Sequence, residues 1–90
     1  MKLYRLYTED KNREEIEQAA NVLFHAYTLS TAIGVWRGTK ENSLCLEVFA
    51  QANELQTAWY KMKVLAAQIK TLNEQECVLL VELDARGEFV

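Results

Sequence analysis

The chain has 90 residues, half of them apolar, with a formal net charge of −3, two cysteines and no proline. A chain of this length is expected to form one domain, here residues 1–90, with a thin core. Its acidic balance argues against nucleic acid and anionic membranes as partners, because both reward clustered positive charge. The sequence has no apolar run of about 18 residues, and its start, MKLYRLYTED, lacks the apolar core of a secretory signal. A cytoplasmic domain without a membrane span is therefore expected.

The chain begins with a predicted strand and a predicted helix. Residues 2–8, KLYRLYT, interleave polar side chains with aromatic and aliphatic ones, which is typical of a strand. A helix is predicted over residues 13–25, because apolar side chains recur there every three to four positions. Asn12 directly precedes this helix as a candidate N-cap, and Glu15 follows three residues later, at the spacing of a capping box.

A β-hairpin is predicted next. Residues 27–37, YTLSTAIGVWR, alternate between two faces and are rich in β-branched types, and residues 43–50, SLCLEVFA, alternate in the same way. The polar segment GTKEN between them, residues 38–42, contains a glycine and is predicted to form the turn. The two strands are therefore expected to pair antiparallel.

The rest of the chain predicts a longer helix and a last strand. The helix is expected over residues 54–71, where large apolar side chains again recur every three to four positions. The segment ECVLLVEL, residues 76–83, is strongly apolar and is predicted to form the last strand. The final residues, DARGEFV, are expected to form a tail.

The predicted order of elements, β-α-β-β-α-β, defines the ferredoxin-like plait of the α+β class. Both crossover connections are expected to be right-handed, so the two helices lie on one face of a four-stranded antiparallel sheet. The spatial strand order is then 4-1-3-2.

Two helices on one face leave the other face of the sheet open, and alternation divides the strand residues between the two faces. The set expected to face the helices is Tyr4, Leu6, Leu29, Ile33, Val35, Leu44, Leu46, Val48, Cys77, Leu79, Val81 and Leu83. The set expected on the open face is Arg5, Tyr7, Ser30, Ala32, Trp36, Cys45, Glu47, Phe49, Val78, Leu80 and Glu82. A shift of one residue in any strand would exchange its two sets, and the last strand is apolar in both.

The open face is the candidate interface. Tyr7, Trp36, Phe49, Val78 and Leu80 would form a large exposed apolar patch, and such contiguous patches mark protein interfaces. The aromatic residues Tyr7, Trp36 and Phe49 would be its anchors. In the alternative interpretation, Trp36 packs over the end of the sheet within its own monomer.

A second candidate feature of this face is a cluster of charges. Arg5 is expected between Glu47 and Glu82, and such a cluster would set the register of the interface. The alternative is a solvated cross-strand ion pair of little energetic consequence.

No set of side chains predicts catalysis, a cofactor or a metal site. His25 is the single histidine, is expected to cap the first helix, and has no cluster of ligands around it. Cys45 and Cys77 are predicted to be free thiols. The first strand is expected to lie between the two strands that carry them, which puts those strands about 9.6 Å apart, beyond the reach of a disulfide. No base is placed to activate Cys45.

RNA recognition motifs share this topology and carry stacking aromatic residues within a basic signature. Tyr7 and Phe49 could provide such aromatic rings, but Glu47 stands where that signature is basic. We therefore expect no nucleic-acid partner.

The opening KLYRLYTEDKN, the hairpin GVWRGTKENSLCLEV and the late segment IKTLNEQECVLLVEL together resemble small uncharacterised proteins of phage and bacterial origin. Those proteins share a G-x-W-x-G-x-x-E-x-S hairpin, which this sequence matches at Gly34, Trp36, Gly38, Glu41 and Ser43. The resemblance implies an accessory protein of a phage or mobile element and no catalytic residue.

The sequence thus favours a non-enzymatic binding or regulatory module that forms a homodimer through its open sheet face or binds another protein there. One alternative is a small dimeric α/β-barrel-type enzyme or small-molecule-binding domain, which rests on analogy of fold. Another is a phage-encoded inhibitor that presents the hairpin or an acidic helix face to a host protein.

Overall fold

The computed structural model describes all residues of the chain, 1–90. Its elements are β1 (Lys2–Glu9), α1 (Arg13–Leu23), β2 (Thr28–Trp36), β3 (Thr39–Ala50), a short 3₁₀ helix η1 (Ala52–Glu54), α2 (Leu55–Leu72) and β4 (Leu79–Asp84). Neither helix combines the length and the hydrophobicity that a membrane span requires.

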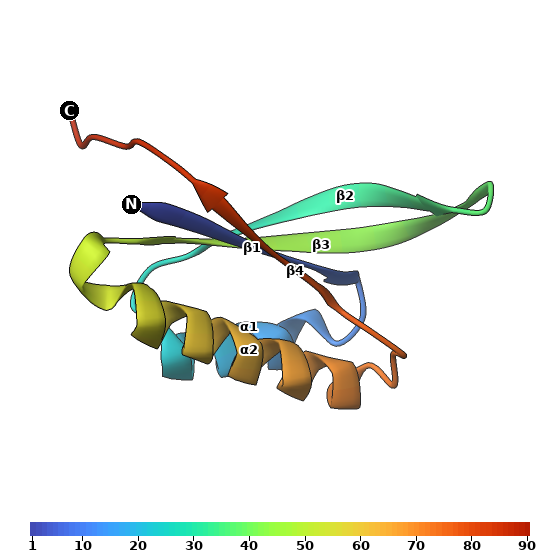
Figure 1. The fold of residues 1–90 in the computed structure, drawn as a ribbon. Coiled ribbons are helices and arrows are strands. Elements are labelled where there is room, and N and C mark those ends of the chain that lie inside the picture. The colour runs from blue at the N-terminus through green and yellow to red at the C-terminus, as the bar shows by residue number, and fades with distance from the viewer.

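The four strands form one antiparallel sheet in the order β2-β3-β1-β4, with both helices on the same face (Figure 1). This arrangement confirms the predicted ferredoxin-like plait. Each of the three strand pairs keeps a constant register over its whole length, so the ladders contain no bulge. The regular ladders mean that alternation along each strand places its side chains strictly on one face or the other.

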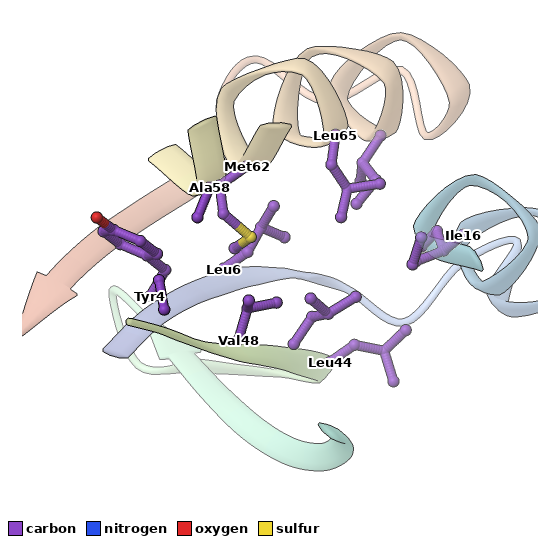
Figure 2. Close-up of a cluster of buried hydrophobic side chains, with 12 residues drawn as sticks. Tyr4, Leu6, Ile16, Leu44, Val48, Ala58, Met62 and Leu65 are labelled. Atoms are coloured by element: carbon purple, nitrogen blue, oxygen red, sulfur yellow. The ribbon is translucent and has the colours of Figure 1, made fainter. Parts of the chain in front are cut away.

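The core lies between the sheet and the two helices (Figure 2). Its buried members are Tyr4, Leu6, Ile16, Ala20, Leu44, Leu46, Val48, Ala50, Ala58, Met62, Leu65 and Ile69. The helical positions of this set repeat every three to four residues and the strand positions every second residue, as a layered packing requires. Burying each large aliphatic side chain stabilises the fold by about 1.5–3 kcal/mol relative to exposure.

The hairpin turn is tighter than the sequence predicted. Residues 39–42, which were expected in the turn, belong to β3, and only Arg37 and Gly38 connect the two strands. Both adopt positive φ angles, 49° and 81°, as a two-residue hairpin of the type I′ kind requires. Glycine adopts a positive φ without strain, whereas arginine is not typical of such a position, so the sequence did not indicate a two-residue turn at Arg37.

The assignment of faces in β4 was wrong. Leu80 and Glu82 pair with Leu6 and Tyr4, so they lie on the helix side and not on the open face. Val78 and Leu80 pack against the core, whereas Leu79, Val81 and Leu83 lie on the open face. The strand begins at Leu79 and leaves Cys77 outside it, exposed. Because β4 is apolar on both faces, alternation along its sequence could not tell which face is buried. The register with β1 determines which residues face the helices.

Ile33 and Val35 were expected in the core and are largely exposed, at 64% and 63% of their surface. They do lie on the helix side of the sheet, because Leu29 of the same strand packs against the core. However, the β2–β3 hairpin projects past the ends of both helices, and nothing covers its underside (Figure 1). We call this projecting part, residues 32–43, the arm.

A buried polar network joins the end of β1, beside the base of the arm, to the helices. Asn73, just after α2, is buried, and its Nδ2 donates to Oε1 of Gln75 at 2.9 Å and to Oγ1 of Thr8 at 3.3 Å. Its Oδ1 accepts from Nδ2 of Asn12 at 3.0 Å. Asn12 therefore ties the start of α1 to the end of α2 and forms no side-chain capping bond, unlike the predicted capping box with Glu15.

Removing the Asn73 amide should destabilise the fold. Asn73→Ala removes the hydrogen bonds of this buried amide to Thr8, Gln75 and Asn12, which costs about 1–3 kcal/mol of unfolding free energy. Urea denaturation followed by circular dichroism measures this loss. The matched control is Asn53→Ala on the exposed η1, expected within about 0.5 kcal/mol of wild type. Equal stability of the two variants would contradict a structural role for the network.

Candidate interaction surface

The open face of the sheet carries three rows of side chains that run across β3, β1 and β4. We call these nine residues the central patch. The rows are Phe49–Leu3–Leu83, Glu47–Arg5–Val81 and Cys45–Tyr7–Leu79. Two apolar rows thus flank a middle row that contains one cation and one anion.

The apolar side chains of the central patch are unusually open to solvent. Phe49 and Leu79 expose 57% and 60% of their surface, and Tyr7 and Leu83 expose 36% and 37%. Leu3, between Phe49 and Leu83, is buried by its neighbours. Scattered exposed apolar residues need no explanation, but these lie on adjacent strands and form a contiguous patch, which makes this face the candidate interaction surface.

Arg5 and Glu47 form the one ion pair of the patch, with Nε and Oε2 2.7 Å apart. The hydrogen bond to Glu47 raises the pKa of the Arg5 guanidinium further above its usual range. The two charges therefore neutralise each other at the middle of the face. Glu82 takes no part, because it lies on the helix side and accepts a hydrogen bond from the Tyr4 hydroxyl at 3.4 Å.

Cys45 is buried in the third row beside Tyr7 and Ser30. Burial, and then the nearby Glu47 carboxylate, raise the pKa of the Cys45 thiol above its ordinary value. Arg5 and hydrogen bonds with Tyr7 and Ser30 act in the opposite direction but do not offset this effect. A protonated, buried thiol is a poor nucleophile, so Cys45 has a packing role.

Trp36 does not belong to the central patch. It lies six residues beyond Ser30 along β2, or about 20 Å, at the tip of the arm. There it exposes 70% of its surface, which contradicts packing within its own monomer. The Arg37 guanidinium lies 5.6 Å from the centre of its ring, within the range of a cation–π contact. The structure thus separates Trp36 from Tyr7 and Phe49, which were predicted to form one patch with it.

Four members of the central patch were missed by the sequence analysis: Leu3, Leu79, Val81 and Leu83. Alternation from Arg5 and Tyr7 could have found Leu3. No local signal could have found the other three, because β4 is apolar on both faces.

A groove of about 510 Å³ lies beside the patch, where the C-terminal tail passes the ends of β2 and β3. Its lining includes the aromatic residues Tyr27, Phe49 and Phe89 and the carboxylates Glu47, Glu54 and Glu88. A smaller hollow of about 240 Å³ lies between the ends of the two helices and includes His25 and Lys61. Nowhere do three His, Cys, Asp or Glu side chains gather as they would around a metal ion.

Neither a family model nor a curated protein matches this chain. Solved structures do share its fold. A DUF3240 family protein from Shewanella baltica OS155 superposes with a TM-score of 0.66 and 10% sequence identity, over 99% of this chain and 93% of that one. A phage SAM lyase in complex with S-methyl-5′-thioadenosine superposes with a TM-score of 0.66 and 11% identity, over 92% of this chain and 80% of that one. The similarity is one of fold.

The two thiols should differ in reactivity. Cys77 is exposed and should react rapidly with an aromatic disulfide reagent at pH 8. The buried Cys45 should react at least about tenfold more slowly under the same conditions. Absorbance of the released thiolate counts the thiols with time. Cys77→Ser should lose the rapid phase, and denaturant should restore one reactive thiol. A rapid phase that survives in Cys77→Ser would show that Cys45 is accessible.

Proposed function

We propose that this protein is a non-enzymatic binding module of the cytoplasm that associates with a second copy of itself through the central patch. The observation that carries the proposal is the contiguous, uncovered apolar surface on β1, β3 and β4. Burial of such a surface releases about 25 cal/mol for each Å² of apolar area removed from water.

The charges of the patch favour a second copy as its occupant. Arg5 and Glu47 neutralise each other, so the face selects neither an acidic nor a basic partner. In a two-fold arrangement the same patch meets itself, and Arg5 of each copy can approach Glu47 of the other. Such an exchange retains one hydrogen-bonded carboxylate for each guanidinium when water leaves the interface.

The size of the face sets the expected strength of this contact. At about 3.3 Å per residue and about 4.8 Å between strands, a sheet whose β1 has 8 residues presents on the order of 500 Å² per copy. Two copies would then bury about 1,000 Å², the lower limit for a specific interface. The central patch covers only three of these four strands, so by itself it buries less than this lower limit and its contact is expected to be weak.

A second candidate function is binding of a small molecule in the groove beside the patch. Its volume of about 510 Å³ and its three aromatic side chains suit a compact organic ligand. A phage SAM lyase of similar fold binds S-methyl-5′-thioadenosine, so this nucleoside is the first probe for calorimetry. The phage or mobile-element origin inferred from the hairpin stays a prediction.

Leu79→Asp should halve the mass of the protein in solution. Leu79 is exposed in the monomer, so the carboxylate costs little folding free energy, but it places an unpaired charge in the buried contact. Size-exclusion chromatography with light scattering measures the mass against the 10.4 kDa of one chain. Circular dichroism checks that the variant is folded.

The control is Val22→Asp, which adds the same charge to the outer surface of α1 at a residue that is 85% exposed. It should leave the mass unchanged. A wild-type monomer, or an unchanged mass for Leu79→Asp, would overturn self-association through the central patch.

A further inference from the structure

The outer edge of the sheet at β2 is long and unprotected. β2 is the terminal strand on its side, has 9 residues and reads TLSTAIGVW, without a charge or a proline. Its ladder with β3 contains no bulge that could twist the edge away. The opposite edge, β4, has 6 residues and carries Glu82 and Asp84. Proteins protect edge strands with charges, proline, bulges or short length, and β2 has none of these.

The hairpin turn determines which backbone groups of β2 point outward. In a two-residue hairpin the residues that flank the turn, here Trp36 and Thr39, form a hydrogen-bonded pair. Pairs then alternate along an antiparallel ladder between hydrogen-bonded and non-hydrogen-bonded. The residues that direct their N–H and C=O groups away from β3 are therefore Leu29, Thr31, Ile33 and Val35.

We propose that the β2 edge pairs antiparallel with the β2 edge of a second copy, with the two-fold axis at Ala32. This register opposes Leu29 to Val35 and Thr31 to Ile33 of the second copy. All four residues with outward-facing backbone groups then meet one another, which completes on the order of eight backbone hydrogen bonds. It is also the register in which all of β2 is paired and no residue overhangs.

The side chains fit the same register. Residues directly opposite each other in an antiparallel pair share a face, so Ile33 and Val35 would lie against Thr31 and Leu29 of the second copy. Leu29 already packs against the core of its own monomer. The two most exposed aliphatic side chains of the arm, at 64% and 63%, would thereby continue the core of the second copy.

Charge complementarity at the tip of the arm supports a second copy as the occupant. The register continues to place Trp36 beside Thr28, and Arg37 beside Tyr27, of the second copy. Tyr27 and Thr28 line the groove that holds the carboxylates of Glu47, Glu54 and Glu88. The exposed cation at the tip of each arm would therefore reach the acidic groove of the other copy.

This contact goes beyond the proposed function and does not depend on it. The edge lies in the plane of the sheet, whereas the central patch covers its face, so one copy can use both. Where the two-fold axes of the two contacts intersect at right angles, the contacts together build a tetramer of two eight-stranded sheets packed face to face, with 222 symmetry.

A cysteine at the two-fold axis tests the pairing. Ala32 opposes itself in a non-hydrogen-bonded pair, where Cα atoms lie about 4.5 Å apart, within the range of a disulfide. In a Cys77→Ser background, Ala32→Cys should form a disulfide-linked dimer under mild oxidation, seen on a non-reducing gel. Thr28→Cys is the control, because it places a thiol on the same face but about 26 Å from its copy. No preferential cross-linking of Ala32→Cys over Thr28→Cys would overturn the proposed register.

A mass measurement separates the two contacts. Ile33→Lys places a charge on the edge and should halve the wild-type mass, whereas Val22→Lys should not. The double variant Ile33→Lys, Leu79→Asp should be a folded monomer. If Leu79→Asp has no effect while Ala32→Cys still cross-links, the central patch fails and the edge contact stands. A wild-type assembly of three chains would overturn the edge pairing, since a two-fold contact cannot close such a ring.

Discussion

Two helices can cover only one face of a four-stranded sheet, and this constraint governs the rest of the molecule. Both crossovers have the same hand, so α1 and α2 lie together and the other face has no layer of its own. The helix side holds a dry core that includes Leu6, Met62 and Leu65. The open side has no second layer to cover it, and it carries exposed apolar side chains on β1, β3 and β4.

On the open face, apolar side chains of β1, β3 and β4 surround a single ion pair. Arg5 and Glu47 satisfy each other within the monomer, so the central patch carries no unpaired charge that would resist burial. Cys45 is kept as a protonated thiol by its burial. These features describe a surface suited to packing.

The arm follows from the same constraint. Since both helices end short of the hairpin tip, Ile33 and Val35 lie on the core side of the sheet without a core to contact. A strand that is apolar on its core side, uncharged along its length and unpaired at its outer edge is open to pairing with another strand. The surface patch and the bare edge are thus two consequences of one topology.

Local signals in the sequence were enough to determine the type and order of the elements, the antiparallel plait and the faces of β1, β2 and β3. Those signals are the periods of 2 and 3.6, and they are strong wherever one face is apolar and the other polar. Tertiary structure alone decided the faces of β4, because Leu79, Leu80 and Val81 look alike locally and only pairing with β1 distinguishes them. It also decided where the helices stop covering the sheet, which left Ile33 exposed, and how far Trp36 lies from Tyr7. The distance between two side chains and the covering of a sheet by helices depend on how the elements pack, and no local sequence pattern encodes either.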